Sequence, residues 1–165
     1  MDPHLQRALA DIDAATQGLS AADWRRCPAG RWDCAQILEH LGKAYGGTAY
    51  ILDKCVADGA PKGHQPSWRQ RLSATIVVTL GYLPSGVKAP SMTVPDGLCG
   101  EEALALARRT LMELDAAAQR CADTFGDNVR VANHPILGGF TVHQWRRFHW
   151  VHTRHHARQI RQRQR

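Results

Sequence analysis

Four long segments of this chain carry apolar residues at the spacing of one helix face, and this pattern restricts the fold more than any other feature of the sequence. The segments cover residues 3–16, 34–57, 100–125 and 142–160. Each amphipathic helix must bury its apolar stripe, and four such helices bury their stripes against one another. We therefore predict an all-α fold, a four-helix bundle, and the length of 165 residues is that of one domain.

The ends of the helices have their own signals. Asp33 and Thr141 are residue types that cap helix N-termini, and Asp58-Gly59 is typical of a helix end. Ser20 and Asp23 predict a short extra helical turn before the second helix. We expect the single domain to cover residues 1–160.

The remaining segments are less regular. Residues 81–100 hold three prolines and four glycines, which predicts a long irregular crossover, and residues 133–139 are rich in turn formers. Residues 74–80 fit either a strand or a buried helix, and their β-branched side chains favour a strand. We expect residues 161–165 to form a basic, frayed tail.

Composition and charge narrow the function classes. No apolar run approaches the roughly 20 residues of a membrane span, and the first residues lack the pattern of a signal peptide, so we expect a cytoplasmic protein. The five cysteines are scattered without a CxxC pair, which argues against a disulfide framework or a zinc ribbon. The net charge is +6, and residues 128–165 contain eight arginines and no acidic residue.

Three histidines are candidate metal ligands. His152 and His156 are four residues apart, so they lie one turn apart on the same helix face, which also carries apolar residues. His40 lies at the inner edge of the apolar stripe of the second helix. Burying an imidazole costs free energy unless its nitrogens are satisfied, and either metal ligation or a hydrogen bond in the core can do this. Three neutral nitrogen ligands would leave coordination positions open.

Two blocks of the sequence resemble a known family. The stretch RWDCAQILEHL (31–41) is similar to the second-helix signature of the DinB/YfiT-like superfamily of metalloenzymes. HPILGGFT (134–141) and HTRHHARQ (152–159) are similar to a subgroup with an HPFFG-LT stretch and an HxxHHxxQ helix, although isoleucine and leucine replace its aromatic pair. The resemblance implies a DinB-like four-helix bundle with a long crossover, and it favours a helix over residues 74–80.

The resemblance also implies a divalent metal held by His40, His152 and His156. We expect zinc first, and nickel, iron and manganese also accept imidazole. The sequence lacks an HExxH motif, and Glu39 points about 100° away from His40 around its helix, so no general base is evident. Some relatives use low-molecular-weight thiols in S-transfer, and others are hydrolases. We therefore expect a metal-dependent enzyme that transfers a small thiol, with a metal-hydroxide hydrolase as the alternative.

Further residues near the expected site have two interpretations each. Arg154, Arg158 and His155 fit either the carboxylates of a thiol substrate or a solvated helix face. His149 either bonds to a metal ligand, contacts the substrate or is a histidine at the edge of the core, and the last is favoured. His134 is a candidate for the mouth of the site.

The partners that we expect are a small-molecule substrate and a second copy of the chain in a homodimer, with no membrane. The arginine-rich C-terminal segment supports a rival hypothesis, a non-catalytic nucleic-acid-binding module. No recognition motif for nucleic acid accompanies those arginines, so we regard this partner as less favoured. A third alternative is a bundle that has lost activity and keeps the metal for stability.

Overall fold

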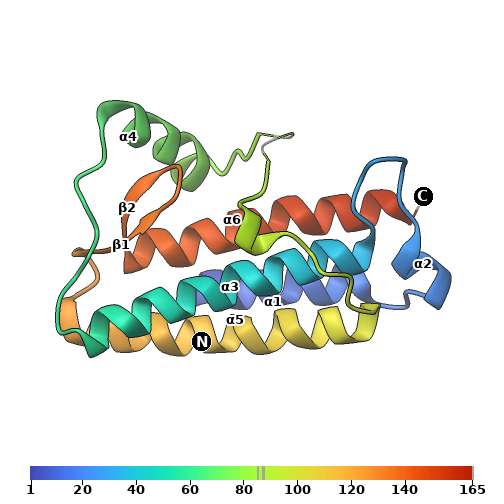
Figure 1. Cartoon of the computed structure of the whole chain (residues 1–165), viewed down its shortest axis with the longest axis horizontal. Helices are drawn as coiled ribbons and strands as arrows, with labels where there is room; N and C mark the ends of the chain where they lie inside the picture. The colour runs from blue at the N-terminus through green and yellow to red at the C-terminus, as the bar shows by residue number, and fades with distance from the viewer. Residues whose placement is uncertain (85, 87, 165) are drawn as a thin grey trace.

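Four long helices lie side by side in the computed structural model, which describes residues 1–84, 86 and 88–164 (Figure 1). They are α1 (Pro3–Thr16), α3 (Cys34–Ala57), α5 (Gly100–Phe125) and α6 (Val142–Arg163). Their apolar stripes meet in one core, whose largest fully buried side chains include Leu5, Leu41, Leu111 and Ile160. The prediction of an all-α fold is confirmed.

Short elements complete the chain. They are α2 (Ala21–Arg25), α4 (Trp68–Ala74), the π-helical turn η1 (Thr75–Thr79), the 3₁₀ turn η2 (Ser91–Thr93), and the strands β1 (Arg130–His134) and β2 (Gly138–Thr141). The predicted caps are present: the side chains of Asp33 and Thr141 accept hydrogen bonds from the N–H groups of Gln36 and Gln144. None of the helices in the described part of the chain is long and apolar enough to span a membrane.

Residues 74–80 are helical, so the local preference for a strand was wrong. Ala74, Val77 and Val78 are buried at helical spacing, while Thr75 and Thr79 are exposed. Packing of this face onto α6 therefore overrides the β-propensity of the side chains. The turn is one residue wider than an α-helical turn, because the N–H of Leu80 bonds to the carbonyl of Thr75.

The segment expected to be only turns forms an antiparallel hairpin of β1 and β2. A neighbouring stretch of chain runs beside β1, with the N–H groups of Lys62 and Gly63 bonded to carbonyls of that strand. A side chain at Gly63 or Gly139 would overlap backbone atoms of the facing segment. Gly63 and Gly139 thus allow the two backbones to approach each other closely. Turn preferences of single residues do not predict such a contact between distant segments.

The end of the chain is also more ordered than expected. Helix α6 continues to Arg163, whose Nε donates to the carbonyl of Trp32 at 2.6 Å. The side-chain amide of Gln164 donates to the carbonyl of Ala15 at 2.7 Å. The prediction of a frayed tail was therefore wrong for these residues, and Arg165 lies outside the described residues.

The crossover from η1 to α5 is fastened to α3 by a buried carboxylate. Glu39 is 1% exposed, and its two oxygens accept hydrogen bonds from three consecutive backbone N–H groups, at 2.6 Å from Asp96, 2.9 Å from Gly97 and 3.0 Å from Leu98. Lys43 lies 3.2 Å from the same carboxylate. Burial alone would raise the pKa of Glu39, but these hydrogen bonds lower it below its ordinary value.

We predict that Glu39→Ala lowers the free energy of unfolding by about 3 kcal/mol, because three backbone N–H groups lose a charged, buried acceptor. Urea unfolding followed by circular dichroism measures the loss. Glu113→Ala, at a half-exposed position on α5, is the matched control and should cost less than about 1 kcal/mol. Equal losses in the two variants would contradict this role of Glu39.

Candidate metal centre

Three histidine rings converge between α3 and α6. The Nε2 atom of His152 lies 3.2 Å from Nε2 of His40 and 3.0 Å from Nε2 of His156. The three residues form the group of metal-ligand candidates found among the described residues. They are 5–9% exposed, whereas the neighbouring His149 is 1% exposed, so the cluster lies at the edge of the core and within reach of the surface.

Hydrogen bonds at the far side of two rings fix where their protons are. Nδ1 of His40 lies 2.9 Å from the carbonyl oxygen of Thr93, and a carbonyl can only accept, so this Nδ1 carries the proton. Nδ1 of His156 lies 2.8 Å from Oε1 of Gln159 and is the donor there by the same reasoning. Both neutral rings therefore present an Nε2 lone pair to His152.

This donor set fits a cation. One proton on Nε2 of His152 can serve only one of the two facing lone pairs, and Nδ1 of His152 is buried without a hydrogen-bond partner in the described structure. A cation shared by the three Nε2 atoms satisfies all of them. Nitrogen ligands about 2.0–2.1 Å from one ion lie about 3.0–3.4 Å from each other, which agrees with the spacing of these rings.

The environment keeps the three rings neutral. Burial lowers the pKa of His40, and burial together with the neighbouring histidines lowers the pKa of His152 well below 6.5. Burial and the nearby His40 lower the pKa of His156 to about 3, against the opposing hydrogen bond of Gln159. Neutral imidazole is the ligating form, so the site is ready for a metal at pH 7.

Aromatic side chains form two walls of the site. The ring of Trp32, in the connector before α3, lies 5.0 Å from the ring of His40. The ring of Phe148 stacks on His152 at 5.5 Å between centroids. These apolar walls limit the approach of water and leave the rings with few competing partners.

The other two histidines proposed for the site lie outside the cluster. His149 bonds to the hydroxyl of Thr48 through Nε2 at 3.0 Å, so it links α6 to α3 without joining the cluster. His134 lies in the hairpin, where its Nδ1 accepts from the N–H groups of Ile136 and Leu137, each at 3.1 Å. It therefore shapes the turn between β1 and β2, and its ring packs on Phe148.

The three residues proposed for substrate carboxylates differ in their contacts. Arg154 donates to the carbonyl of Gly81 at 2.9 Å and lies over the ring of Trp150, so it holds the end of η1 against α6. His155 is half-buried and accepts from the amide of Gln159 at 3.0 Å. Arg158 is exposed on α6, two residues after His156.

Sequence reasoning missed two groups that orient the ligands. Gln159 follows His156 by three residues on the same helix face, a spacing that signals a side-chain contact. The carbonyl of Thr93 had no such signal, because a backbone group 53 positions away in sequence leaves no residue type to recognise.

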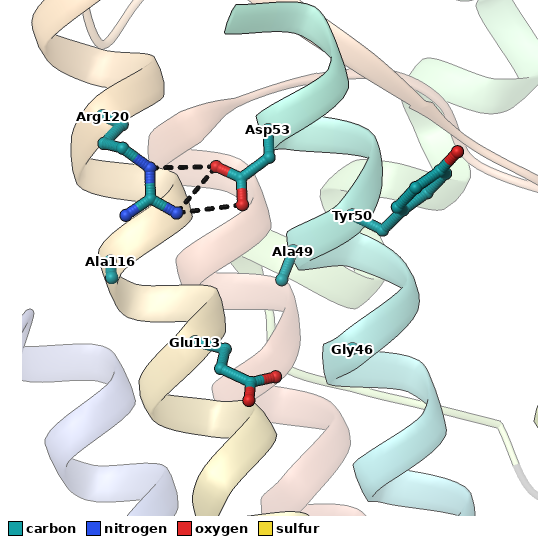
Figure 2. Close-up of a pocket in the computed structure, with 7 residues that line it drawn as sticks. All are labelled: Gly46, Ala49, Tyr50, Asp53, Glu113, Ala116 and Arg120. Atoms are coloured by element: carbon teal, nitrogen blue, oxygen red, sulfur yellow. Dashed lines mark hydrogen bonds and ion pairs between the residues drawn. The ribbon is translucent and has the colours of Figure 1, made fainter. Parts of the chain in front are cut away.

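One hollow on the described surface is unrelated to the histidines. It lies between α3 and α5, where Gly46, Ala49 and Ala116 leave room (Figure 2). Arg120 and Asp53 close one end through hydrogen bonds of 2.7–3.0 Å, so the opposite charges there neutralise each other. We assign no chemistry to this groove.

We predict that acid weakens the fold through its buried histidines. Burial lowers the pKa of His149 to about 3, so below pH 6.5 the unfolded chain takes up a proton that the folded chain does not. The free energy of unfolding should therefore fall as the pH drops from 6.5 to 4, and this residue should contribute about 1.4 kcal/mol per pH unit.

Urea unfolding at several pH values, with a chelator present, measures this slope. His149→Gln should flatten it by that amount, and His143→Gln, at an exposed position of the same helix, should leave it unchanged. A slope unaffected by His149→Gln would show that another group accounts for the acid sensitivity.

Comparison with known proteins agrees with this architecture. Residues 4–160 match the family described as the DinB superfamily. None of the curated proteins and none of the solved structures matches the chain. The matched region contains both helices that carry the three histidines and the crossover that orients His40. The chain therefore belongs to the DinB superfamily.

Proposed function

We propose that this protein is a metal-dependent enzyme that transfers a small thiol to an electrophile, with His40, His152 and His156 as the metal ligands. The single observation that carries the proposal is the convergence of three neutral ring nitrogens, two of them with lone pairs aimed at the third. The HTRHHARQ segment of α6 further supports membership of the subgroup with the HxxHHxxQ helix.

The choice of a thiol over water rests on the missing base. Glu39 is next to His40 in sequence, but three backbone N–H groups occupy its carboxylate. Thr153 follows His152, and its hydroxyl donates to the carbonyl of His149 and lies 2.5 Å from the hydroxyl of Tyr45. Helix α6 contains no acidic residue. A nucleophile that needs little help to lose its proton is therefore favoured.

A divalent cation lowers the pKa of a coordinated thiol, which starts near 8.5 and so needs only a modest shift to ionise at pH 7. The protein's residues do the rest. The three imidazoles would hold the ion, and Trp32 and Phe148 restrict water around it. Neither arginine proposed for a thiol carboxylate lies on the ligand face: Arg158 is exposed two residues after His156, about 200° away around α6, and Arg154 is engaged by Gly81.

We predict that the purified protein binds about one divalent metal per chain, with zinc first and nickel, iron or manganese as the alternatives. His40→Ala, His152→Ala and His156→Ala should each remove it, because two imidazoles hold an ion weakly. Elemental analysis after gel filtration measures the stoichiometry, and His143→Ala, at an exposed position of α6, should retain full metal. Stoichiometric metal in the His152→Ala protein would contradict the proposed ligand set.

We predict metal-dependent conjugation of a low-molecular-weight thiol to a chromogenic aryl halide, in which a carbon–sulfur bond forms, the carbon–halogen bond breaks with loss of halide, and the thiol proton passes to solvent. His156→Ala should abolish the rate, whereas Arg158→Gln, which changes the opposite face of α6, should leave the KM of every thiol within about twofold. A panel of thiols assayed with chelated and metal-loaded protein measures both effects. Ester or amide hydrolysis as the sole metal-dependent reaction would instead identify a hydrolase.

A further inference from the structure

Acidic residues are missing from one whole part of the molecule. Residues 59–95 and 128–165 contain no aspartate or glutamate, yet they hold twelve of the chain's 21 lysines and arginines. Among the described residues these two segments build α4, η1, the hairpin and α6, which pack against one another. Cations in this region therefore have to find partners elsewhere or stay without a counter-charge.

A cavity of about 230 Å³ opens in this region, between α4 and η1 on one side and the hairpin and the start of α6 on the other. Its apolar surface comes from Ala74, Leu137 and Phe140, which are 1–8% exposed. Its polar lining consists of two arginines and three uncharged side chains: Arg71, Arg130, Thr75, Thr79 and Gln144. The described lining contains no acidic residue.

The two arginines of this cavity lack counter-ions. The arginines that form ion pairs in the described structure are others. One nitrogen of Arg130 donates to the carbonyl of Gly139 at 2.9 Å, which fixes the direction of its guanidinium and leaves further N–H donors available. The groove of Figure 2 offers a contrast, because there Arg120 is neutralised by Asp53. An anion between Arg71 and Arg130 would neutralise both.

Two further groups favour negative charge at this place. Oε1 of Gln144 accepts from the N–H of Thr141 at 3.0 Å, so the amide nitrogen of Gln144 is left to donate. The cavity also adjoins the first turn of the 22-residue α6, where the helix dipole is positive. Gln144 precedes His152 by eight residues, or about 12 Å along the helix, so this cavity is separate from the metal centre.

We propose that this cavity is a second ligand site, which binds a small organic anion. The carboxylate or phosphate would lie between Arg71 and Arg130, and the apolar body would lie on Leu137 and Phe140. The volume is below the roughly 300–1,000 Å³ of most sites for drug-sized molecules, so the ligand is small. The proposal does not depend on the thiol chemistry of the metal centre.

Calorimetric titration with phenyl phosphate and with benzoate tests this proposal and shows which acid group the site prefers. Benzyl alcohol, which is neutral, should not bind. Arg71→Gln and Arg130→Gln should each weaken binding about tenfold or more, because each removes a charge-assisted hydrogen bond. Arg69→Gln is the matched control, since Arg69 is on α4 but lies over the ring of Trp68, and it should change the affinity less than twofold.

Arg71 is exposed, so its replacement leaves the fold intact, and the unfolding midpoint of Arg130→Gln checks the hairpin. Chelated protein should bind the anions as tightly as metal-loaded protein, whether or not the thiol reaction is found. The proposal is overturned if neither anion binds, if binding requires the metal, or if Arg69→Gln weakens it as much as Arg71→Gln. Tighter binding of a single-stranded oligonucleotide, weakened equally by all three substitutions, would overturn it in favour of a polyanion surface.

Discussion

The hydrogen bonds of one buried carboxylate decide whether the histidine site exists as described. Glu39 holds the backbone of residues 96–98 against α3, and the carbonyl of Thr93, a short distance earlier in the same crossover, fixes the proton on His40. Glu39 thus holds the crossover in place, and the adjacent His40 donates a hydrogen bond to that crossover. The crossover places the Thr93 carbonyl beside Nδ1 of His40, and the proton held there leaves the lone pair on Nε2. The position of the crossover therefore determines both the local packing and the state of this candidate ligand.

Helix α6 packs into the core although its sequence is rich in polar residues. Eleven of its side chains are buried, and they include His149, His152, Thr153 and His156. Most of these polar groups are satisfied across the interface with α3, through Thr48, Tyr45 and His40. The two Nε2 lone pairs that face His152 stand out against that background, and they distinguish the candidate ligands from His149, whose Nδ1 also lacks a partner in the described structure.

The sequence was sufficient for the long helices and for the grouping of the three candidate histidines, because both depend on periodicity within each helix. His152 and His156 share a face by spacing alone, and His40 lies on an apolar stripe. It was insufficient where contacts between distant segments decide the outcome. Val77 and Val78 form a helix turn because α6 covers them, the hairpin forms beside Gly63, and Arg163 is ordered by the carbonyl of Trp32. His149 and Arg154 have the right residue types, but their partners engage them elsewhere.

The wide turn η1 has a consequence for how this segment tolerates change in length. It accommodates one residue more than an α-helical turn before the chain leaves the helical conformation at Gly81, which has a φ of +69°. Loss of a single residue between positions 75 and 79 would rotate α4 by about 100° relative to everything that follows. Ala74 would leave the core and the outer face of Trp68 would turn inward. Insertions and deletions are therefore more disruptive here than substitutions that keep Val77 and Val78 apolar.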